Sequence, residues 1–153
     1  SKIKTEQVNI KRLLEDIALS YRPLSDPRGI KIEIECEDDL LSNVMKEPLT
    51  TSLGNLLENA IKFSYDGSRV VLKSFLRDGY LHIQVIDNGP GIELEEREKI
   101  FERFYKSEKS HNSTGSGMGL AIVRELVGTM KGEINLVSEP GKGSTFEIKL
   151  RAG

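Results

Sequence analysis

The sequence has 153 residues, of which 37% are hydrophobic and 30% are charged, so it is long enough to bury one core and too short for two. The formal net charge of -2 gives no broad basic field, which argues against duplex nucleic acid as a partner. A single cysteine excludes an internal disulfide and a multi-cysteine metal cluster. We therefore expect one globular domain over residues 1–153. Because no apolar run approaches the roughly 20 residues of a membrane span, we also expect it to be cytoplasmic, without direct contact with a membrane.

The start of the chain predicts a short strand followed by a helix. Residues 8–10 suit a strand, and the apolar residues that follow recur at helical spacing. Pro23 and Pro27 interrupt this pattern, so we expect the helix to end near Tyr21.

Two further patterns lead into the middle of the chain. Isoleucines at every second position from Ile30 to Ile34 predict a half-buried strand with one face in water. Leucines from Leu49 to Leu57 then recur at i, i+4, i+7 and i+8, which predicts a long amphipathic helix that begins near residues 47–48.

The second half of the chain predicts two hairpins and two helices. Asp78-Gly79 is a turn signal between two apolar strands, which should therefore pair antiparallel. Hairpins exclude a purely parallel sheet, so the pattern predicts an α+β fold. We expect a two-layer α/β sandwich. Its mixed, mostly antiparallel sheet should have about five strands, with about three helices on one face. The expected elements are strands at 70–76, 80–87, 133–138 and 144–150, helices at 95–101 and 119–130, and a long polar loop at 106–117.

The long central helix carries a polar stripe. Asn55, Asn59 and Lys62 lie at i, i+4 and i+7 and must point the same way. Asparagine is a poor helix former, so two on one stripe require a reason. An amide oxygen is able to ligate a hard cation, and an ammonium group neutralises phosphate oxygens. The alternative interpretation is an ordinary solvated face.

A carboxylate and a glycine-rich loop follow the strand at 80–87. The period of two places Asp87 on the same face as the apolar residues of that strand, so its carboxylate is aimed at the core. A buried carboxylate needs a donor, which either a ligand amino group or a backbone amide would supply. The glycines of residues 88–91 allow a sharp turn and a close approach to a flat ligand. The alternative is an aspartate that only caps a turn.

Two weaker signals accompany these. Residues 115–120 read Gly-Ser-Gly-Met-Gly-Leu before a helical run, which would turn backbone amides toward phosphates, although the spacing fits neither a Rossmann fingerprint nor a Walker loop. Ser144 shares a face with the apolar residues of the last strand, so its hydroxyl is aimed at the core. It would bridge to Asp87 if their strands are neighbours, although backbone satisfaction of a serine is commoner.

Taken together, these segments resemble the motifs of one family, the ATP-binding catalytic domains of sensor histidine kinases, which belong to the gyrase, chaperone, histidine-kinase and mismatch-repair ATPase superfamily. The match implies the Bergerat-type ATP-binding fold. Residues 55–63 resemble the N box, 87–92 the first glycine box, 100–106 the F box, 115–120 the second glycine box and 141–144 the third.

The resemblance implies a role for each matching position. Asp87 would accept the adenine amino group of ATP, with Ser144 assisting through water. Asn59 would ligate Mg²⁺, and Asn55 would ligate the same ion or position it. Lys62 would contact phosphates.

Further positions complete the implied site. Lys106 would be a second phosphate contact, and residues 107–116 would form a mobile lid. The remaining nucleotide-contacting positions that the resemblance implies are Phe63, Gly89, Gly91, Ile92, Tyr105, Gly115, Gly117, Met118, Gly119 and Leu120.

The implied reaction is transfer of the ATP γ-phosphoryl group to a histidine on a separate dimerisation and phosphoacceptor domain in two-component signalling. That domain is absent from this sequence, and we expect residues 1–6 to be a remnant of its linker. The expected partners are the histidine-bearing domain and a response regulator, and the isolated domain should be monomeric with little turnover. Two alternatives are an ATP hydrolase with Glu58 as base and an ATP-sensing docking module; Asn55, where related hydrolases carry a glutamate, argues against the first.

Overall fold

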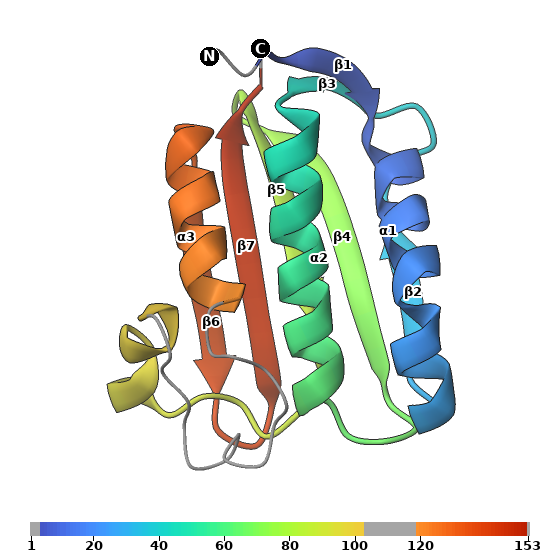
Figure 1. Ribbon diagram of the computed structural model, residues 1–153, viewed down its shortest axis with the longest axis vertical. Coiled ribbons are helices and arrows are strands. Elements are labelled where there is room, and N and C mark those ends of the chain that lie inside the picture. Colours follow the sequence, from blue (N-terminus) through green and yellow to red (C-terminus); the bar gives the residue numbers. More distant parts are fainter. Residues whose placement is uncertain (1–3, 103–118, 153) are drawn as a thin grey trace.

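A computed structural model describes residues 4–102 and 119–152 of the chain. Its main layer is a five-stranded sheet in the order β2-β4-β5-β7-β6 (Figure 1). Only the β2 and β4 pair is parallel, and the other neighbours are antiparallel, which confirms the mixed, mostly antiparallel sheet. The strands are β2 (Lys31–Glu35), β4 (Arg69–Arg77), β5 (Tyr80–Ile86), β6 (Glu133–Glu139) and β7 (Gly143–Arg151).

In the described part of the chain, three α-helices cover one face of this sheet (Figure 1). Their apolar stripes pack on the inward residues of the strands, so that Leu53, Leu56 and Leu57 of the central helix are fully buried. The two-layer arrangement predicted from the hydrophobic periodicity is therefore confirmed. The helices are α1 (Ile10–Ser25), α2 (Lys46–Phe63) and α3 (Gly119–Thr129).

The first strand lies outside the main sheet. β1 (Glu6–Asn9) pairs antiparallel with β3 (Leu41–Val44) in a separate two-stranded sheet. β3 was not predicted, because its inward positions are Ser42 and Val44, and a serine at one of them hides the apolar alternation.

One predicted helix end and one predicted helix type were wrong. α1 does not end near Tyr21 but continues through Pro23 to Ser25. A proline removes one helical N–H, and in the last turn this costs a single hydrogen bond while the amide of Asp26 still reaches Arg22. The helix expected at 95–101 is instead two 3₁₀ turns, at Leu94–Glu96 and Lys99–Phe101.

The predicted hairpin between β4 and β5 is confirmed. Asp78 and Gly79 adopt positive φ angles of 52 and 81, the left-handed pair that joins two antiparallel strands through a two-residue turn. The hairpin sets the register of β5, which is the middle strand of the five. Asp87, the residue after Ile86, therefore lies at the end of the middle strand, between β4 and β7. In the described segments, no helix is both long and apolar enough to cross a bilayer.

Candidate functional site

Asp87 directly follows β5, the middle strand of the sheet, and only 5% of its surface is exposed. Its Oδ1 accepts hydrogen bonds from the amides of Gly89 at 3.2 Å and Ser144 at 3.1 Å. Burial raises the pKa of Asp87 to about 6, while the two backbone donors act in the opposite direction. The expectation that this carboxylate faces the core is confirmed.

The second carboxylate oxygen of Asp87 differs from the first. Within the described residues, the structure records hydrogen bonds to Oδ1 and none to Oδ2. A buried carboxylate has about four lone-pair sites, so one side of this group retains its full capacity to accept. A ligand N–H group is a chemically suitable partner for it.

Two glycines fix the loop that surrounds Asp87. A Cβ at Gly89 would collide with the carbonyl oxygen of Phe63, so the loop after β5 rests directly on the C-terminal end of α2. Gly143 has a φ of 86, and a Cβ there would collide with the carbonyl oxygen of Asp87. The close approach of a ligand to the glycines of residues 88–91 stays a prediction, and the structure shows a further requirement for Gly89, which is contact with the chain's own backbone.

Ser144 joins this cluster in a different way from the predicted bridge. Its backbone pairs with that of Asp87 on the neighbouring strand, since the Asp87 amide donates to the Ser144 carbonyl at 2.9 Å. Its hydroxyl instead lies 2.9 Å from the hydroxyl of Ser138 on β6. Both serines are buried, at 5% and 3% exposure.

Ser138 was missed by the sequence reasoning. Its hydroxyl accepts from the amide of Ile92 at 2.7 Å and lies 3.1 Å from the carbonyl oxygen of Gly143. The signal was available, because Ser138 shares the inward parity of Ile134 and Leu136 and is therefore a polar residue aimed at the core. Gly91 and Ile92 thus belong to the same hydrogen-bonded loop as Asp87.

The polar stripe of α2 is present as predicted and is partly buried. The amide nitrogen of Asn55 donates to the carbonyl oxygen of Gly119 at 3.4 Å, so the stripe begins beside the start of α3. Asn59 follows one turn later, and Lys62 Nζ lies 3.4 Å from Glu58 Oε2. Phe63 follows Lys62 as the last residue of α2, and its carbonyl oxygen lies against Gly89 of the loop after Asp87, so α2 connects the two ends of the candidate site.

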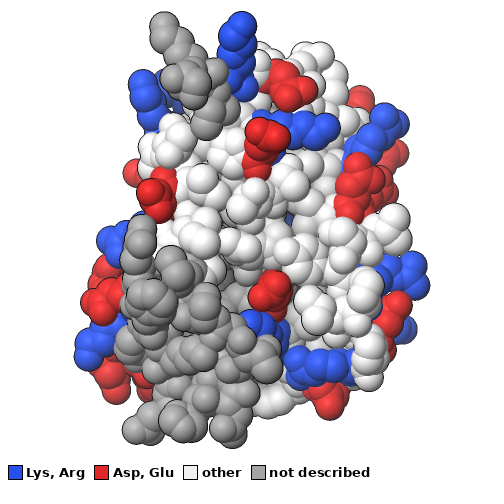
Figure 2. Space-filling model, viewed as in Figure 1, with Lys and Arg blue, Asp and Glu red and all other residues white. Residues whose placement is uncertain are grey.

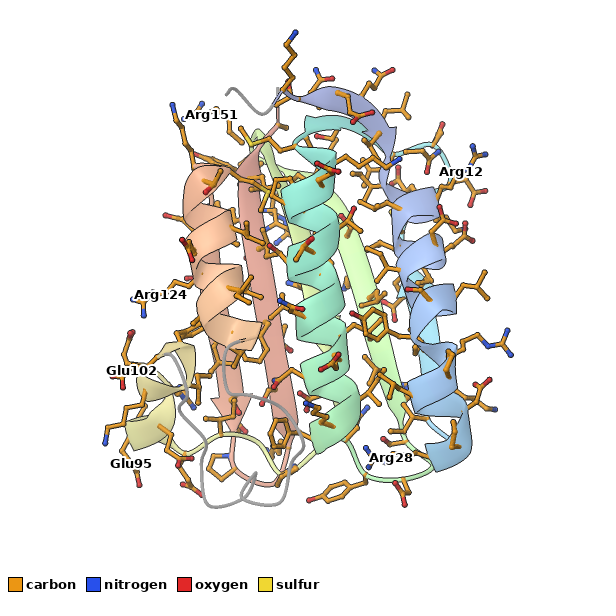
Figure 3. The ribbon with its side chains drawn as sticks, in the orientation of Figure 1. Arg12, Arg28, Glu95, Glu102, Arg124 and Arg151 are labelled. Carbon is orange, nitrogen blue, oxygen red and sulfur yellow. The ribbon has the colours of Figure 1, made fainter. Side chains whose placement is uncertain are left out.

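Arg28, labelled in Figure 3, fixes the C-terminal end of α2 and was also missed. Its guanidinium donates to the carbonyl oxygens of Ile61 at 2.5 Å and Ser64 at 2.6 Å, and its Nε lies 2.7 Å from Asp66 Oδ1. A cation at this position satisfies carbonyls that the helix leaves open and complements the helix dipole. No local sequence pattern links Arg28 to a helix that ends more than thirty residues later.

Several predicted site residues lie outside the described residues. These are Tyr105, Lys106, Gly115, Gly117 and Met118, together with the lid at 107–116 and the last part of the segment resembling the F box. Gly119 is exposed at the first position of α3, and Leu120 follows it half-buried and packed against the core. The structure therefore brings Asp87 together with Gly89, Phe63 and Ser144 at one end of α2. It brings Asn55 together with Gly119 farther along the same helix.

Charge and metal-ligand chemistry limit what this candidate site is able to hold. Figure 2 shows basic and acidic side chains interspersed over the helical face, without a large area of one sign among its described residues. No cluster of three or more His, Cys, Asp or Glu side chains occurs in the part of the chain described. A divalent cation here would therefore depend on amide oxygens and on oxygens of the ligand itself.

Comparison with known families assigns the chain. Residues 44–153 match the family described as histidine kinase-, DNA gyrase B-, and HSP90-like ATPase. The chain belongs to this family. Its similar proteins within this family include sensor histidine kinases. The chain is a catalytic and ATP-binding domain of the type found in those kinases. The resemblance stated from the sequence motifs is confirmed.

Two curated relatives illustrate the similarity. The sensor-like histidine kinase SenX3 of Mycobacterium tuberculosis is 33% identical over 147 residues, covering 95% of this chain and 36% of SenX3. The aerobic respiration control sensor protein ArcB of Escherichia coli is 33% identical over 155 residues, covering 98% of this chain and 20% of ArcB. The chain thus spans about a third or less of each relative.

Solved structures agree with the fold. Full-length ShkA in complex with AMPPNP superposes with a TM-score of 0.88 at 29% identity, over 100% of this chain and 32% of ShkA. The mycobacterial sensor histidine kinase MprB gives 0.82 at 27% identity, over 97% of each chain. The catalytic domain of histidine kinase ThkA gives 0.86 at 22% identity, which supports the fold alone.

Proposed function

We propose that this domain binds Mg-ATP and transfers the γ-phosphoryl group to a histidine on a separate dimerisation and phosphoacceptor domain. The observation that carries the proposal is the buried carboxylate of Asp87, which has one oxygen saturated by backbone amides and the other without a recorded partner among the described residues. Family membership makes ATP the expected ligand of such a group.

Asp87 and its surroundings fit adenine. The exocyclic amino group of adenine is a donor, and Asp87 Oδ2 is an acceptor to which none of the described residues donates. Guanine would present a carbonyl oxygen to the same carboxylate, which repels it. The loop at Gly89, Gly91 and Ile92, with Ser144 beside it, would surround the base, and Phe63 would flank it.

The stripe on α2 fits the triphosphate end. The Asn55 amide nitrogen already donates to Gly119, which leaves its oxygen able to face a cation, and Asn59 presents a second amide one turn away. Lys62 and the N-terminal end of α3, with Gly119 and Leu120, would stabilise phosphate charge. Mg²⁺, when bound, would neutralise the phosphate oxygens and help to align the γ-phosphoryl group. Lys106, Tyr105, Gly115, Gly117 and Met118 remain proposed contacts on the same basis of family resemblance.

The chemistry requires no general base within this domain. A neutral imidazole is itself the nucleophile, so the domain has to position ATP and neutralise its charge. Asn55 carries an amide, which is unable to deprotonate water. Glu58, the other candidate base, lies 3.4 Å from Lys62 in an ion pair along the helix. These two observations favour a kinase over a hydrolase.

The partners follow from the family and are proposals for this chain. A histidine-bearing helical domain of the parent kinase would supply the nucleophile, and a response regulator would receive the phosphoryl group afterwards. ArcB and SenX3 are much longer than this chain, so such proteins have room for a histidine-bearing domain and for further domains. The domain alone would be monomeric and cytoplasmic.

The test is to incubate the domain with γ-labelled ATP and Mg²⁺, alone and with candidate histidine-bearing hairpins. We expect saturable ATP binding, very slow phosphate release by the domain alone, and labelled histidine when the proper hairpin is added. Rapid release of phosphate without a hairpin would indicate a hydrolase. Binding without transfer to any hairpin would indicate an ATP-sensing module.

A further inference from the structure

The hydrogen bonds around Ser138 fix the direction of every proton in a small buried network. A serine hydroxyl has one proton to donate and two lone pairs to accept with. The amide of Ile92, 2.7 Å away, has only a proton to offer, so Ser138 accepts from it. The carbonyl oxygen of Gly143, 3.1 Å away, only accepts, so it takes the single proton of Ser138.

One lone pair of Ser138 then remains for its third neighbour. The Ser144 hydroxyl lies 2.9 Å away, and either oxygen of that pair could be the donor on distance alone. Because the proton of Ser138 is committed to Gly143, the contact is satisfied only if Ser144 donates. This is the one arrangement that satisfies all three contacts of a hydroxyl that is 3% exposed, and burial makes an unsatisfied polar group costly.

We infer that Ser138, which is only 3% exposed, contributes to nucleotide base specificity by forcing the Ser144 hydroxyl to act as a hydrogen-bond acceptor. The inference rests on the proposed function and deepens it. With its proton directed at Ser138, Ser144 has only lone pairs to offer to a base or to a bridging water. Asp87, whose Oδ1 binds the Ser144 amide at 3.1 Å, also only accepts when ionised.

Two adjacent acceptors discriminate between purines. The amino group at position 6 of adenine donates, so it is compatible with both Asp87 and Ser144. The carbonyl oxygen at position 6 of a 6-oxopurine accepts, so it would meet two acceptors and no donor. Without Ser138, the Ser144 hydroxyl would be free to rotate and donate to that carbonyl oxygen.

Contacts of the Ser138 backbone and side chain keep its hydroxyl in position for this hydrogen-bond direction. Arg97 donates from its guanidinium to the Ser138 carbonyl oxygen, so the residue is held through both its backbone and its side chain by the segment after Asp87. Ser138 also lies opposite Ser144 in the register of β6 and β7. The two hydroxyls are therefore held together by the sheet itself.

The experiment compares ATP with ITP, which carries the 6-oxo group but lacks the 2-amino group of GTP. Affinities for both nucleotides are measured by displacement of a fluorescent ATP analogue from the wild-type domain, Ser138→Ala and Ser138→Cys. We expect the ATP-to-ITP affinity ratio to fall about tenfold in both variants, the size of one hydrogen bond in free energy. A looser loop would weaken both nucleotides alike and leave the ratio unchanged.

The matched control is the same substitution in a Ser144→Ala background. If Ser138 acts through Ser144, then Ser138→Ala changes the ratio no further once Ser144 is gone. An unchanged ratio in the single variants, or an equal further fall in the double variant, would overturn the inference while wild-type ATP binding upheld the proposed function. Failure of the wild-type domain to bind ATP at all would overturn both.

Discussion

The two ends of the candidate site are built in different ways. At the Asp87 end, backbone amides, two glycines in close backbone contact and a pair of buried serines fix each polar atom within the sheet and its loops. At the Asn55 end, the polar groups are side chains on one stripe of α2, and the recorded contacts are a 3.4 Å hydrogen bond and a 3.4 Å ion pair. The groups proposed to recognise the base are thus fixed within the folded core, whereas the proposed cation and phosphate contacts would need the ligand to complete them.

This contrast predicts that substitutions at the two ends fail differently. A change at the Asp87 end should alter which nucleotide binds and also the stability of the free protein. A change on the stripe should alter what happens to the phosphates while the free protein stays as stable as before.

The largest expected effect is that of Asp87→Asn. The amide would keep an oxygen for the amides of Gly89 and Ser144 but would present an N–H to the adenine amino group, so donor would face donor. We expect ATP affinity to fall by at least about a hundredfold in isothermal titration calorimetry, with an unchanged circular dichroism spectrum. Wild-type affinity in this variant would show that the carboxylate does not read the base.

The second prediction concerns the free protein and pH. Because the folded-state pKa of Asp87 is raised to about 6 from 3.8, its contribution to stability is fully present below pH 3.8 and is lost as pH rises through 6. Wild type should therefore lose up to about 3 kcal/mol of unfolding free energy relative to Asp87→Asn between these values. Urea denaturation of both proteins from pH 4 to pH 7.5 measures the difference.

A constant difference between the two proteins across that range would contradict the prediction. It would mean that the carboxylate is better solvated than its 5% exposure indicates. Asn59→Ala is a suitable control, because it changes no titrating group and should follow the wild-type profile.

The smallest of these effects is expected on the stripe. Asn59→Ala removes one amide ligand from a partly buried helix face, so histidine phosphorylation with the proper hairpin should fall by about tenfold or more. Alanine is the better helix former, so thermal stability should not decrease. The phosphorylation rate and the melting temperature are measured on the same preparation, and undiminished labelling would contradict a role for Asn59 in binding the cation.

Much of the fold was accessible from periodicity. The strands of the main sheet and the long helix α2 were predicted because their inward positions are almost all apolar. β3 was not, since Ser42 occupies an inward position and the strand pairs with β1 apart from the main sheet. The end of α1 was misplaced because a proline in the last turn costs too little to stop a helix whose apolar face is already packed.

The site was accessible only in part, for a related reason. Asp87 and Ser144 were found because strand parity aims them inward, and the same parity would have found Ser138. Arg28 could not be found in this way, because it acts on carbonyls that are distant in sequence and only the packing of α1 against α2 brings them together. The interlocking of Gly89 with Phe63 is likewise a property of the assembled layers.

The central claim is that Asp87 recognises the amino group at position 6 of adenine, and one comparison tests it directly. ATP and purine riboside triphosphate, which differ only in that amino group, are titrated into the wild-type domain and into Asp87→Asn at pH 7.5 with Mg²⁺. We predict that the wild type prefers ATP strongly and that the variant binds the two nucleotides with similar weak affinity. Equal affinity for the two nucleotides in the wild-type domain would contradict the account.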